Sequence, residues 1–407
     1  MYSPDFLNGL SSELVSLKET AKYKFEKEIE GKQGPEVTIA GKKVLMFASN
    51  NYLGLANHSK IVAAAKEGLD TCGYGLSSVR FLSGTQTIHT ELEKKIATLL
   101  GVEDAILYST NFMANLGFFA SIVNEGFGKE EWKDAIYSDA LNHASIIDAF
   151  KLCAKEHLDK RIYLHKDVAA LRTLLEEDKD AGYRNKIIVT DGVFSMEGDT
   201  ADLASLTALA DEFGALLFVD DAHGVGVLGK SGAGTPEAQG LHARVDVLSG
   251  TLGKALGGAI GGYIAGKKDL VDFLRQKSRT YIFSNSLPPS VATASIQAID
   301  LLSEESELLD RSRENAAFFR EALVQLGFKV LPGSHPIVPV MLGDAQRTQE
   351  MSKRLLEEGL YVVGLWFPVV PEGEARLRFQ VSAAHTKDQL QKALSVIEKV
   401  GKELRVI

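Results

Sequence analysis

The most restrictive feature of this sequence is an alternation of short apolar runs with amphipathic segments of helical length, which begins at about Ser59. The runs are AILYS, AIYSD, RIYLH, KIIVTDG, ALLFVDD, VDVLSG and GGYIAG. Strands that alternate with helices form βαβ units, in which a mostly parallel sheet is covered on both faces. The sequence therefore predicts an α/β fold. Ligands of such sheets bind beyond the carboxyl ends of the strands, so the residues after each run are the site candidates.

Smaller units flank this alternation. The N-terminal stretch predicts a helix from leucines at helical spacing (Leu7, Leu10, Leu14 and Leu17), and EVTIAGKKVLMF predicts a hairpin around Gly41. After Pro288-Pro289 comes a long helical stretch to about Phe328, then strands in HPIVPVML, YVVGL and ARLRFQVS, and a last helix from Thr386. We expect a helix and hairpin segment in residues 1–45, a large domain in residues 46–287, and a smaller α+β domain in residues 288–407.

Composition excludes several classes of protein. The 407 residues are 45% hydrophobic, and a net charge of −9 is spread along the chain, which argues against nucleic-acid binding. Cys72 and Cys153 suit a reducing compartment and offer neither a disulfide framework nor zinc spacing. We find no signal peptide and no window that approaches a membrane span. The expectation is a cytoplasmic protein with no metal site, no membrane contact and more than one domain.

One motif is tempting and is rejected. GVGVLGKS, residues 224–231, matches the P-loop pattern, and its first six residues match the dinucleotide pattern. Both patterns need a helix directly after the glycines, because the helix N-terminus binds the phosphate. GAGTPEAQG follows instead, which is typical of a loop, and Asp220 and Asp221 would repel a polyphosphate. A P-loop nucleotide-binding protein is kept only as a remote alternative.

Polar residues follow several of the predicted strands. Asp220 and His223 follow ALLFVDD, and KIIVTDGVFSMEGD supplies Asp191, Ser195 and Glu197. Two helix starts also carry candidates. STN, residues 109–111, offers N-cap side chains at a helix start that can bind phosphate, and His143 lies at another helix start. Each of these residues alone could be no more than a turn or a cap.

A single lysine, Lys254, lies in the small-residue stretch SGTLGKALGG, residues 249–258. One explanation is a tight turn with an incidental charge. The other is a bulky group against the backbone, bonded to the lysine. A lysine on a glycine-rich turn, a strand-end aspartate, a phosphate-binding helix start and two histidines suit pyridoxal 5′-phosphate. The lysine would form the Schiff base, and the acid would keep the pyridine nitrogen protonated.

These residues also resemble a known family. The blocks NNYLGL, RFLSGTQTIHTELE, SDALNHASIID, TDGVFSMEGD, VDDAHG, GTLGKALGG, FSNSLPP and ARLRFQVSAAHT are similar to the α-oxoamine synthases. These are pyridoxal-phosphate enzymes of the aspartate-aminotransferase fold, fold type I. The resemblance runs from about Asn50 to the C-terminus. It implies a fold-type-I transferase that is active as a homodimer, with active sites at the subunit interface.

The resemblance implies roles around the cofactor ring. Lys254 would bind the cofactor covalently and later transfer a proton. Asp220 would pair with the pyridine nitrogen, His223 with the ring hydroxyl, and His143 would stack on the ring face. Ser195 would lie beside the cofactor.

The remaining implied roles concern phosphate and substrate. Asn111 and Phe112 would bind phosphate through backbone N–H groups, and Thr251 would add a hydroxyl. Phe283 and Ser284 would reach the phosphate of the neighbouring subunit. The implied substrate contacts are Asn50 and Arg378, the latter as a bidentate partner of the amino-acid carboxylate. From the residues alone, Asn50 could be a turn residue and Arg378 a solvent-facing one.

Within the family, GTLGKALGG, SRTYIFSNSL and IVPVMLGDA are most similar to the branch that condenses glycine with acetyl-CoA to 2-amino-3-oxobutyrate and CoA, in threonine and glycine metabolism. The serine palmitoyltransferase and aminolevulinate synthase branches tend to have Ser-Lys or Thr-Lys where this chain has Gly253-Lys254. GFGKEEWKD resembles a short insertion, and DDAHGVGVLG also resembles sister branches. The alternatives are therefore 8-amino-7-oxononanoate synthesis and serine palmitoyl transfer.

Overall fold

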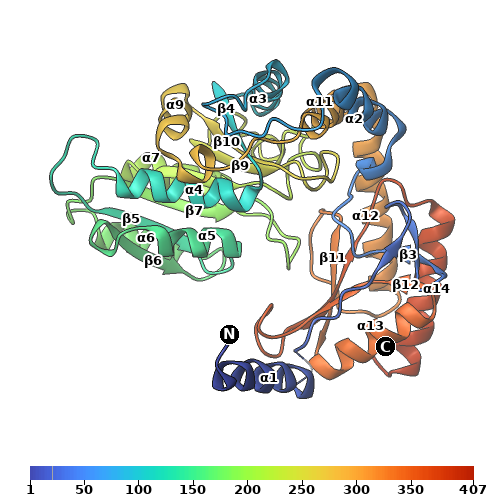
Figure 1. Cartoon of the computed structure of the whole chain (residues 1–407). Coiled ribbons are helices and arrows are strands. Elements are labelled where there is room, and N and C mark those ends of the chain that lie inside the picture. The colour runs from blue at the N-terminus through green and yellow to red at the C-terminus, as the bar shows by residue number, and fades with distance from the viewer. Residues whose placement is uncertain (21) are drawn as a thin grey trace.

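The computed structural model describes residues 1–20 and 22–407, and a seven-stranded sheet forms its centre (Figure 1). The strand order is β4-β10-β9-β8-β7-β5-β6, and only β10 runs antiparallel to its neighbours. The strands are β4 (Asp104–Tyr108), β5 (Asp134–Asp139), β6 (Leu158–Tyr163), β7 (Lys186–Asp191), β8 (Leu216–Asp220), β9 (Val247–Thr251) and β10 (Gly262–Gly266). The mostly parallel sheet predicted from the alternation is confirmed.

Helices cover both faces of this sheet. The helices of this part of the chain are α2 (Ser59–Cys72), α3 (Thr87–Leu100), α4 (Asn111–Asn124), α5 (Ala144–Ala149), α6 (Val168–Glu177), α7 (Leu203–Phe213), α8 (Thr235–Ala238), α9 (Lys268–Lys277) and α10 (Arg279–Ile282), with short 3₁₀ turns at Leu55–Asn57, Phe150–Leu152 and Lys155–His157. Side chains alternate along a strand. Leu217 and Val219 therefore belong to the core under α3, α6 and α7, whereas Phe218 belongs to the core under α4, α5 and α9.

The C-terminal part contains a three-stranded antiparallel sheet, in the order β11-β14-β13. Its elements are α11 (Pro289–Glu304), α12 (Glu307–Gln325), β11 (Ile337–Gly343), α13 (Ala345–Glu357), β12 (Leu360–Tyr361), β13 (Val363–Leu365), β14 (Ala375–Gln380) and α14 (Lys387–Glu403). The long helical stretch expected up to about Phe328 is two helices, because the chain leaves helical geometry at Glu305 (φ −129°). The last helix begins after Thr386, whose side chain and that of Gln389 form a capping box.

The N-terminal segment forms α1 (Pro4–Glu19), β1 (Ile29–Glu30), β2 (Glu36–Ile39) and β3 (Lys42–Met46). The predicted helix and hairpin are both present. β3 also pairs in parallel with β12, so the hairpin belongs to a sheet that includes a C-terminal strand. The domain limits at residues 45 and 287 remain a prediction. Within the described residues, no helix combines the length and the apolar character that a membrane span requires.

Candidate functional site

The carboxyl ends of three neighbouring parallel strands place polar side chains in a row. The register pairs Asp191 on β7 with Asp220 on β8, and Asp220 with Ser249 on β9. All three side chains are buried. Lys254 follows β9 by three residues, on a loop in which Gly257 (φ +98°) and Gly258 (φ +74°) adopt a left-handed conformation. Such a conformation favours glycine, which accounts for part of the small-residue run.

Two asparagines of α4 hold the carboxylate of Asp220. Asn115 Nδ2 donates to Oδ2 at 2.7 Å, and Asn111 Nδ2 lies 3.1 Å from both oxygens. The backbone N–H of Ala222 adds a bond of 3.1 Å to Oδ1. Ser249 Oγ lies 2.7 Å from the amide oxygen of Asn115 and 3.1 Å from that of Asn111, so the two oxygens share its one proton and both amides are oriented. Asp220 is thus fixed in place by a connected network of hydrogen bonds.

Lys254 is partly buried, and its ammonium group makes no hydrogen bond or ion pair with a described residue. Burial, with a contribution from Arg378, lowers the pKa of Lys254 to about 8, although Asp220 and Asp191 act in the opposite direction. Burial and the neighbouring Asp220 raise the pKa of Asp191 well above its usual value. A lysine with this pKa can supply a neutral amine near neutral pH, as a Schiff base or a general base requires.

His143 is the N-cap of α5, as expected from its position at a helix start. Its Nδ1 lies 2.7 Å from Ser145 Oγ, which in turn accepts from Asn115 Nδ2 at 2.8 Å. The ring of Phe112 meets the imidazole edge-on, with centroids 6.4 Å apart. Burial lowers the pKa of His143, and Asp220 opposes this shift. The network around Asp220 therefore extends to His143 through Asn115 and Ser145.

His223 lies next to residues from the segment after β3. Its Nδ1 is 2.9 Å from the hydroxyl of Tyr52, which is also 3.2 Å from Asn50 Oδ1. Gln380 on β14 donates to the same Asn50 oxygen. Burial, followed by the effect of Lys254, lowers the pKa of His223 well below its usual value. The two residues predicted for ring hydroxyl and substrate, His223 and Asn50, are therefore linked through Tyr52.

Two arginines of β14 have different surroundings. Arg376 is fully buried and pairs with Glu197 (3.0 Å) and Glu374 (2.9 Å). Arg378 Nη1 donates to the backbone oxygen of Ser195 at 2.9 Å, while its buried Nε has no hydrogen-bond partner among the described residues. Arg378 is not solvent-facing. A partly buried guanidinium with an unused buried donor is suited to an anionic ligand such as a carboxylate.

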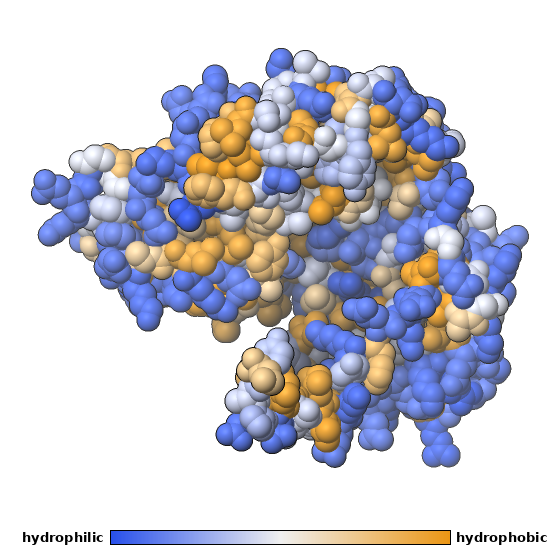
Figure 2. All heavy atoms as spheres, viewed as in Figure 1, coloured by the Kyte–Doolittle hydropathy of each residue, from blue (hydrophilic) through white to orange (hydrophobic). Residues whose placement is uncertain are grey.

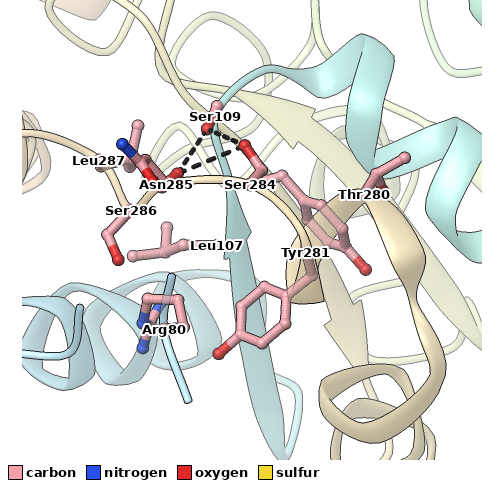
Figure 3. Close-up of a pocket in the computed structure, with 10 residues that line it drawn as sticks. Arg80, Leu107, Ser109, Thr280, Tyr281, Ser284, Asn285, Ser286 and Leu287 are labelled. Carbon is pink, nitrogen blue, oxygen red and sulfur yellow. Dashed lines mark hydrogen bonds between the residues drawn. The ribbon is translucent and has the colours of Figure 1, made fainter. Parts of the chain in front are cut away.

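The start of α4 borders a small hollow (Figure 3). Thr110 is the N-cap, since its Oγ1 accepts from Met113 N at 3.1 Å. In Figure 3 the side chains of Ser109 and Ser284 point toward one another, with their oxygens 3.3 Å apart. Phe283 is largely exposed. The contact of Ser284 is with the helix start of its own chain, and its expected contact with the neighbouring subunit remains a prediction.

Thr251 contacts the loop that carries Lys254, and Ser195 contacts Arg378. Thr251 Oγ1 donates to Gly261 O at 3.0 Å and accepts from Gly253 N at 3.0 Å, so it closes the start of the Lys254 loop. Ser195 offers its backbone oxygen to Arg378. The cofactor and substrate roles expected for Thr251 and Ser195, like those of the other predicted site residues, remain predictions.

The glycine-rich segment after β8 is a loop, and the helix that follows, α8, has only four residues. Its glycines make room for the buried carboxylate of Asp221. A Cβ at Gly224 would lie 2.0 Å from Asp221 Oδ1, and one at Gly234 would lie 2.0 Å from Oδ2. Thr235 donates to both oxygens, through its backbone N–H (2.7 Å) and its hydroxyl (2.6 Å). This geometry explains the glycines without a phosphate and excludes a P-loop here.

The residues present fit pyridoxal phosphate. Asp220 is an immobilised acid, Lys254 has a lowered pKa, and Arg378 has an unused donor beside them. When bound, the cofactor supplies an electron sink, and such a sink needs an acid at its ring nitrogen. The sequence interpretation missed the supporting side chains, namely Asn115, Ser145, Ser249, Tyr52 and Arg376. Asn115 could have been found, since it lies one helical turn after Asn111 on the same face.

Comparison with known proteins agrees with this geometry. The family model "Aminotransferase class I and II" matches residues 42–397. The chain is 47% identical to the 2-amino-3-ketobutyrate coenzyme A ligase of Escherichia coli (strain K12), with 99% of each chain covered. It is 43% identical to the 8-amino-7-oxononanoate synthase 1 of Bacillus subtilis (strain 168), with 98% of each covered.

Solved structures of similar proteins have the same fold over the whole chain. A structure of SPT with its PLP superimposes with a TM-score of 0.91 at 32% identity, and the match covers 100% of both chains. The serine palmitoyltransferase of Sphingomonas wittichii superimposes with a TM-score of 0.90 at 30% identity over 99% of both chains. The similarity thus extends over the whole chain and includes the loop that carries Lys254.

Proposed function

Because the chain belongs to the aminotransferase class I and II family, within its α-oxoamine synthase group, we propose that it condenses glycine with acetyl-CoA to 2-amino-3-oxobutyrate and CoA. The observation that carries this proposal is the 47% identity over 99% of the chain to 2-amino-3-ketobutyrate coenzyme A ligases. The identity to 8-amino-7-oxononanoate synthases is 43%, so that activity is the second candidate.

The proposed reaction divides the work between cofactor and protein. Pyridoxal phosphate supplies the electron sink that stabilises negative charge at the α-carbon of glycine. Lys254 would hold the cofactor, and its free neutral amine would accept the α-proton of glycine. Its pKa of about 8 makes that amine available near neutral pH. Asp220, fixed by Asn111 and Asn115, pairs with the ring nitrogen and keeps it protonated.

The remaining residues position the reactants. Arg378 would bind the glycine carboxylate with the guanidinium donor that the protein leaves unused. Asn50, in the segment after β3, would also contact the substrate. His143 would hold the ring face of the cofactor, and His223 would donate to its ring hydroxyl. The start of α4, at Asn111 and Phe112, together with Thr251 at the end of β9, would bind the phosphate. With the amine and carboxylate of glycine both held, the acetyl thioester is the reactant that approaches the α-carbon, and CoA leaves.

We also propose a homodimer, in which Phe283 and Ser284 contribute to the partner's phosphate site, and a cytoplasmic location. The exposure of Phe283 and the free thiols of Cys72 and Cys153 support these two proposals.

The proposed function is tested by glycine-dependent release of CoA thiol from acetyl-CoA. The wild-type protein, loaded with pyridoxal phosphate, should release CoA only when glycine is present. Lys254→Ala should abolish this turnover while it still binds the cofactor non-covalently. Borohydride should remove the visible absorption band of the wild type by reducing the bond at Lys254. CoA release that does not depend on glycine, or full activity of Lys254→Ala, would contradict the proposal.

A further inference from the structure

The hydroxyl of Tyr52 lies between the imidazole of His223 and the side-chain amide of Asn50. Tyr52 is fully buried in the segment between β3 and the 3₁₀ turn at Leu55–Asn57. Its ring packs edge-on against His335, with centroids 5.1 Å apart. The hydroxyl lies 2.9 Å from His223 Nδ1 and 3.2 Å from Asn50 Oδ1, and the side chain of Gln380 also bonds to it. Burial raises the pKa of Tyr52, so the hydroxyl keeps its single proton.

The surroundings decide where that proton goes. Asn50 Oδ1 already accepts a hydrogen bond from Gln380 Nε2. His223 Nδ1 has no donor other than Tyr52 among the described residues. Because the lowered pKa of His223 keeps its imidazole neutral, the ring carries one proton and can accept at one nitrogen. Donation from Tyr52 to Nδ1 therefore places the proton of His223 on Nε2.

The backbone of His223 is held independently. His335 accepts from Ile337 N at its Nδ1 (3.0 Å), so its Nε2 donates to the carbonyl oxygen of His223 (2.9 Å). Burial lowers the pKa of His335 to about 3, and this arrangement is kept at any working pH. The backbone of His223 is thus held without Tyr52, whereas the proton on its ring depends on Tyr52.

We propose that Tyr52 is a positioning residue, whose hydroxyl donates to Nδ1 of His223 and holds that imidazole as the tautomer with its proton on Nε2. This tautomer is a hydrogen-bond donor toward the hydroxyl oxygen of the cofactor ring. The opposite tautomer would present a lone pair to that oxygen and repel it. The inference depends on the binding of pyridoxal phosphate at this site. It does not depend on which amino acid or acyl group the enzyme uses.

The first test is a pH titration of the visible absorbance of the cofactor-loaded protein, without substrates. A donor on the ring oxygen withdraws negative charge and lowers the basicity of the adjacent Schiff-base nitrogen. Tyr52→Phe keeps the buried ring but removes the hydroxyl that holds His223 as a donor toward the ring oxygen. The titration midpoint should therefore rise by about 0.5–1 pH unit. The other titratable or charged groups that act on His223 are Lys254, His335, Arg378 and His143. All of these are kept in the variant.

Tyr137→Phe is the matched control. Tyr137 is also fully buried, and its hydroxyl donates to Asp178 at 3.0 Å, within the large domain. Its removal should leave the absorbance midpoint unchanged, although it lowers stability by a similar amount. An unchanged midpoint in Tyr52→Phe, or an equal shift in Tyr137→Phe, would overturn the proposal.

The second test needs no variant of Tyr52. The ¹⁵N resonances of the imidazole nitrogens distinguish the two neutral tautomers, and the signals of His223 can be assigned by their loss in His223→Asn. The wild-type protein should show His223 protonated at Nε2. Protonation at Nδ1 would mean that Tyr52 donates to Asn50 instead, and would overturn the proposal. Neither test uses substrates, so either failure leaves the proposed reaction intact.

Discussion

At the scale of single residues, the site depends on hydrogen bonds that hold charged groups in fixed positions. Asp220 receives donors from Asn111, Asn115 and Ala222. A carboxylate accepts from all of these donors, whereas an amide in the same place would lose one of these hydrogen bonds. Hydrogen-bond partners also distinguish the two arginines of β14. Arg376 is paired with two glutamates, whereas Nε of Arg378 has no partner among the described residues.

Asp220→Asn should therefore fold but lower the exchange of the glycine α-proton with solvent by about 100-fold or more. The amide cannot hold the ring nitrogen as a cation, so the electron sink is lost. Exchange in D₂O, followed by proton NMR, measures the effect directly. Asp246→Asn is a suitable control, because Asp246 accepts from Leu217 N at the opposite end of the sheet. Wild-type exchange in Asp220→Asn would mean that the acid is only a turn residue.

Sequence reasoning identified the strand-end acids, the lysine and the histidines, but not the side chains that support them. Motif spacing places Asp220 at a strand end, and the parallel register then brings it beside Asp191 and Ser249. Asn115 and Tyr52 come from distant segments, and only the packing of α4 and of the segment after β3 brings them to the site. Helical spacing from Asn111 is a signal for Asn115, but no spacing in the sequence indicates the contact of Tyr52.

At the scale of elements, the loop that carries Ser195 is attached to its neighbours through His165. The imidazole, just after β6, bridges Asp139 at the end of β5 (3.1 Å) and Asp199 in the loop after β7 (3.2 Å). Burial alone would lower the pKa of His165, but its hydrogen bonds with the two aspartates raise it to about 9. Because the pKa of His165 is higher in the folded protein than in the unfolded chain, its charged imidazole stabilises the fold. This stabilisation is complete below the usual pKa of 6.5 and is lost as the pH rises through 9.

His165→Ala should lower Tm by about 2–4 °C at pH 6. The difference from the wild type should become smaller at pH 10, where the wild-type imidazole is neutral. Thermal unfolding followed by circular dichroism at both pH values checks this. Lys166→Ala is the control, because it removes the other cation that pairs with Asp199 (2.9 Å) and keeps the imidazole of His165. A difference from wild type that is equal at pH 6 and pH 10 would show that His165 contributes packing and not charge.

The elements themselves were largely predictable from periodicity, and the exceptions have physical reasons. The alternation of apolar runs predicted the strands of the large sheet because most of the runs are buried on both faces, whereas the edge strand β6 exposes Ile162. The break between α11 and α12 at Glu305 carries no glycine or proline, so periodicity alone continued the helix. The pairing of β3 with β12 joins residues more than 300 positions apart, and no local pattern records such a contact.

At the scale of the whole molecule, α1 is an amphipathic helix without a buried residue. Phe6, Leu7, Leu10, Leu14 and Val15 are each about half exposed. Figure 2 shows hydrophobic atoms at the lower end of the view, where α1 lies in Figure 1. An apolar stripe of this kind is expected to pack against another surface. In the proposed homodimer, the second copy is the partner that would cover it.

Leu7→Glu combined with Leu14→Glu should therefore weaken dimerisation, by at least tenfold in Kd, since two buried leucines contribute about 3 kcal/mol or more. Ser12→Glu adds a charge on the same exposed helix and is the control. Sedimentation velocity over a range of concentrations gives the association state of each variant. A dimer of wild-type strength in the double variant would show that α1 lies outside the interface.

The measurement that tests the central claim most directly is a steady-state comparison of kcat/KM across substrate pairs. Glycine, L-alanine and L-serine are each combined with acetyl-, succinyl-, pimeloyl- and palmitoyl-CoA. Glycine with acetyl-CoA should give the highest value. L-Alanine should react slowly, because one extra methyl group is rejected by only about 1–3 kcal/mol. A higher kcat/KM for alanine with pimeloyl-CoA, or for serine with palmitoyl-CoA, would contradict the proposed reaction.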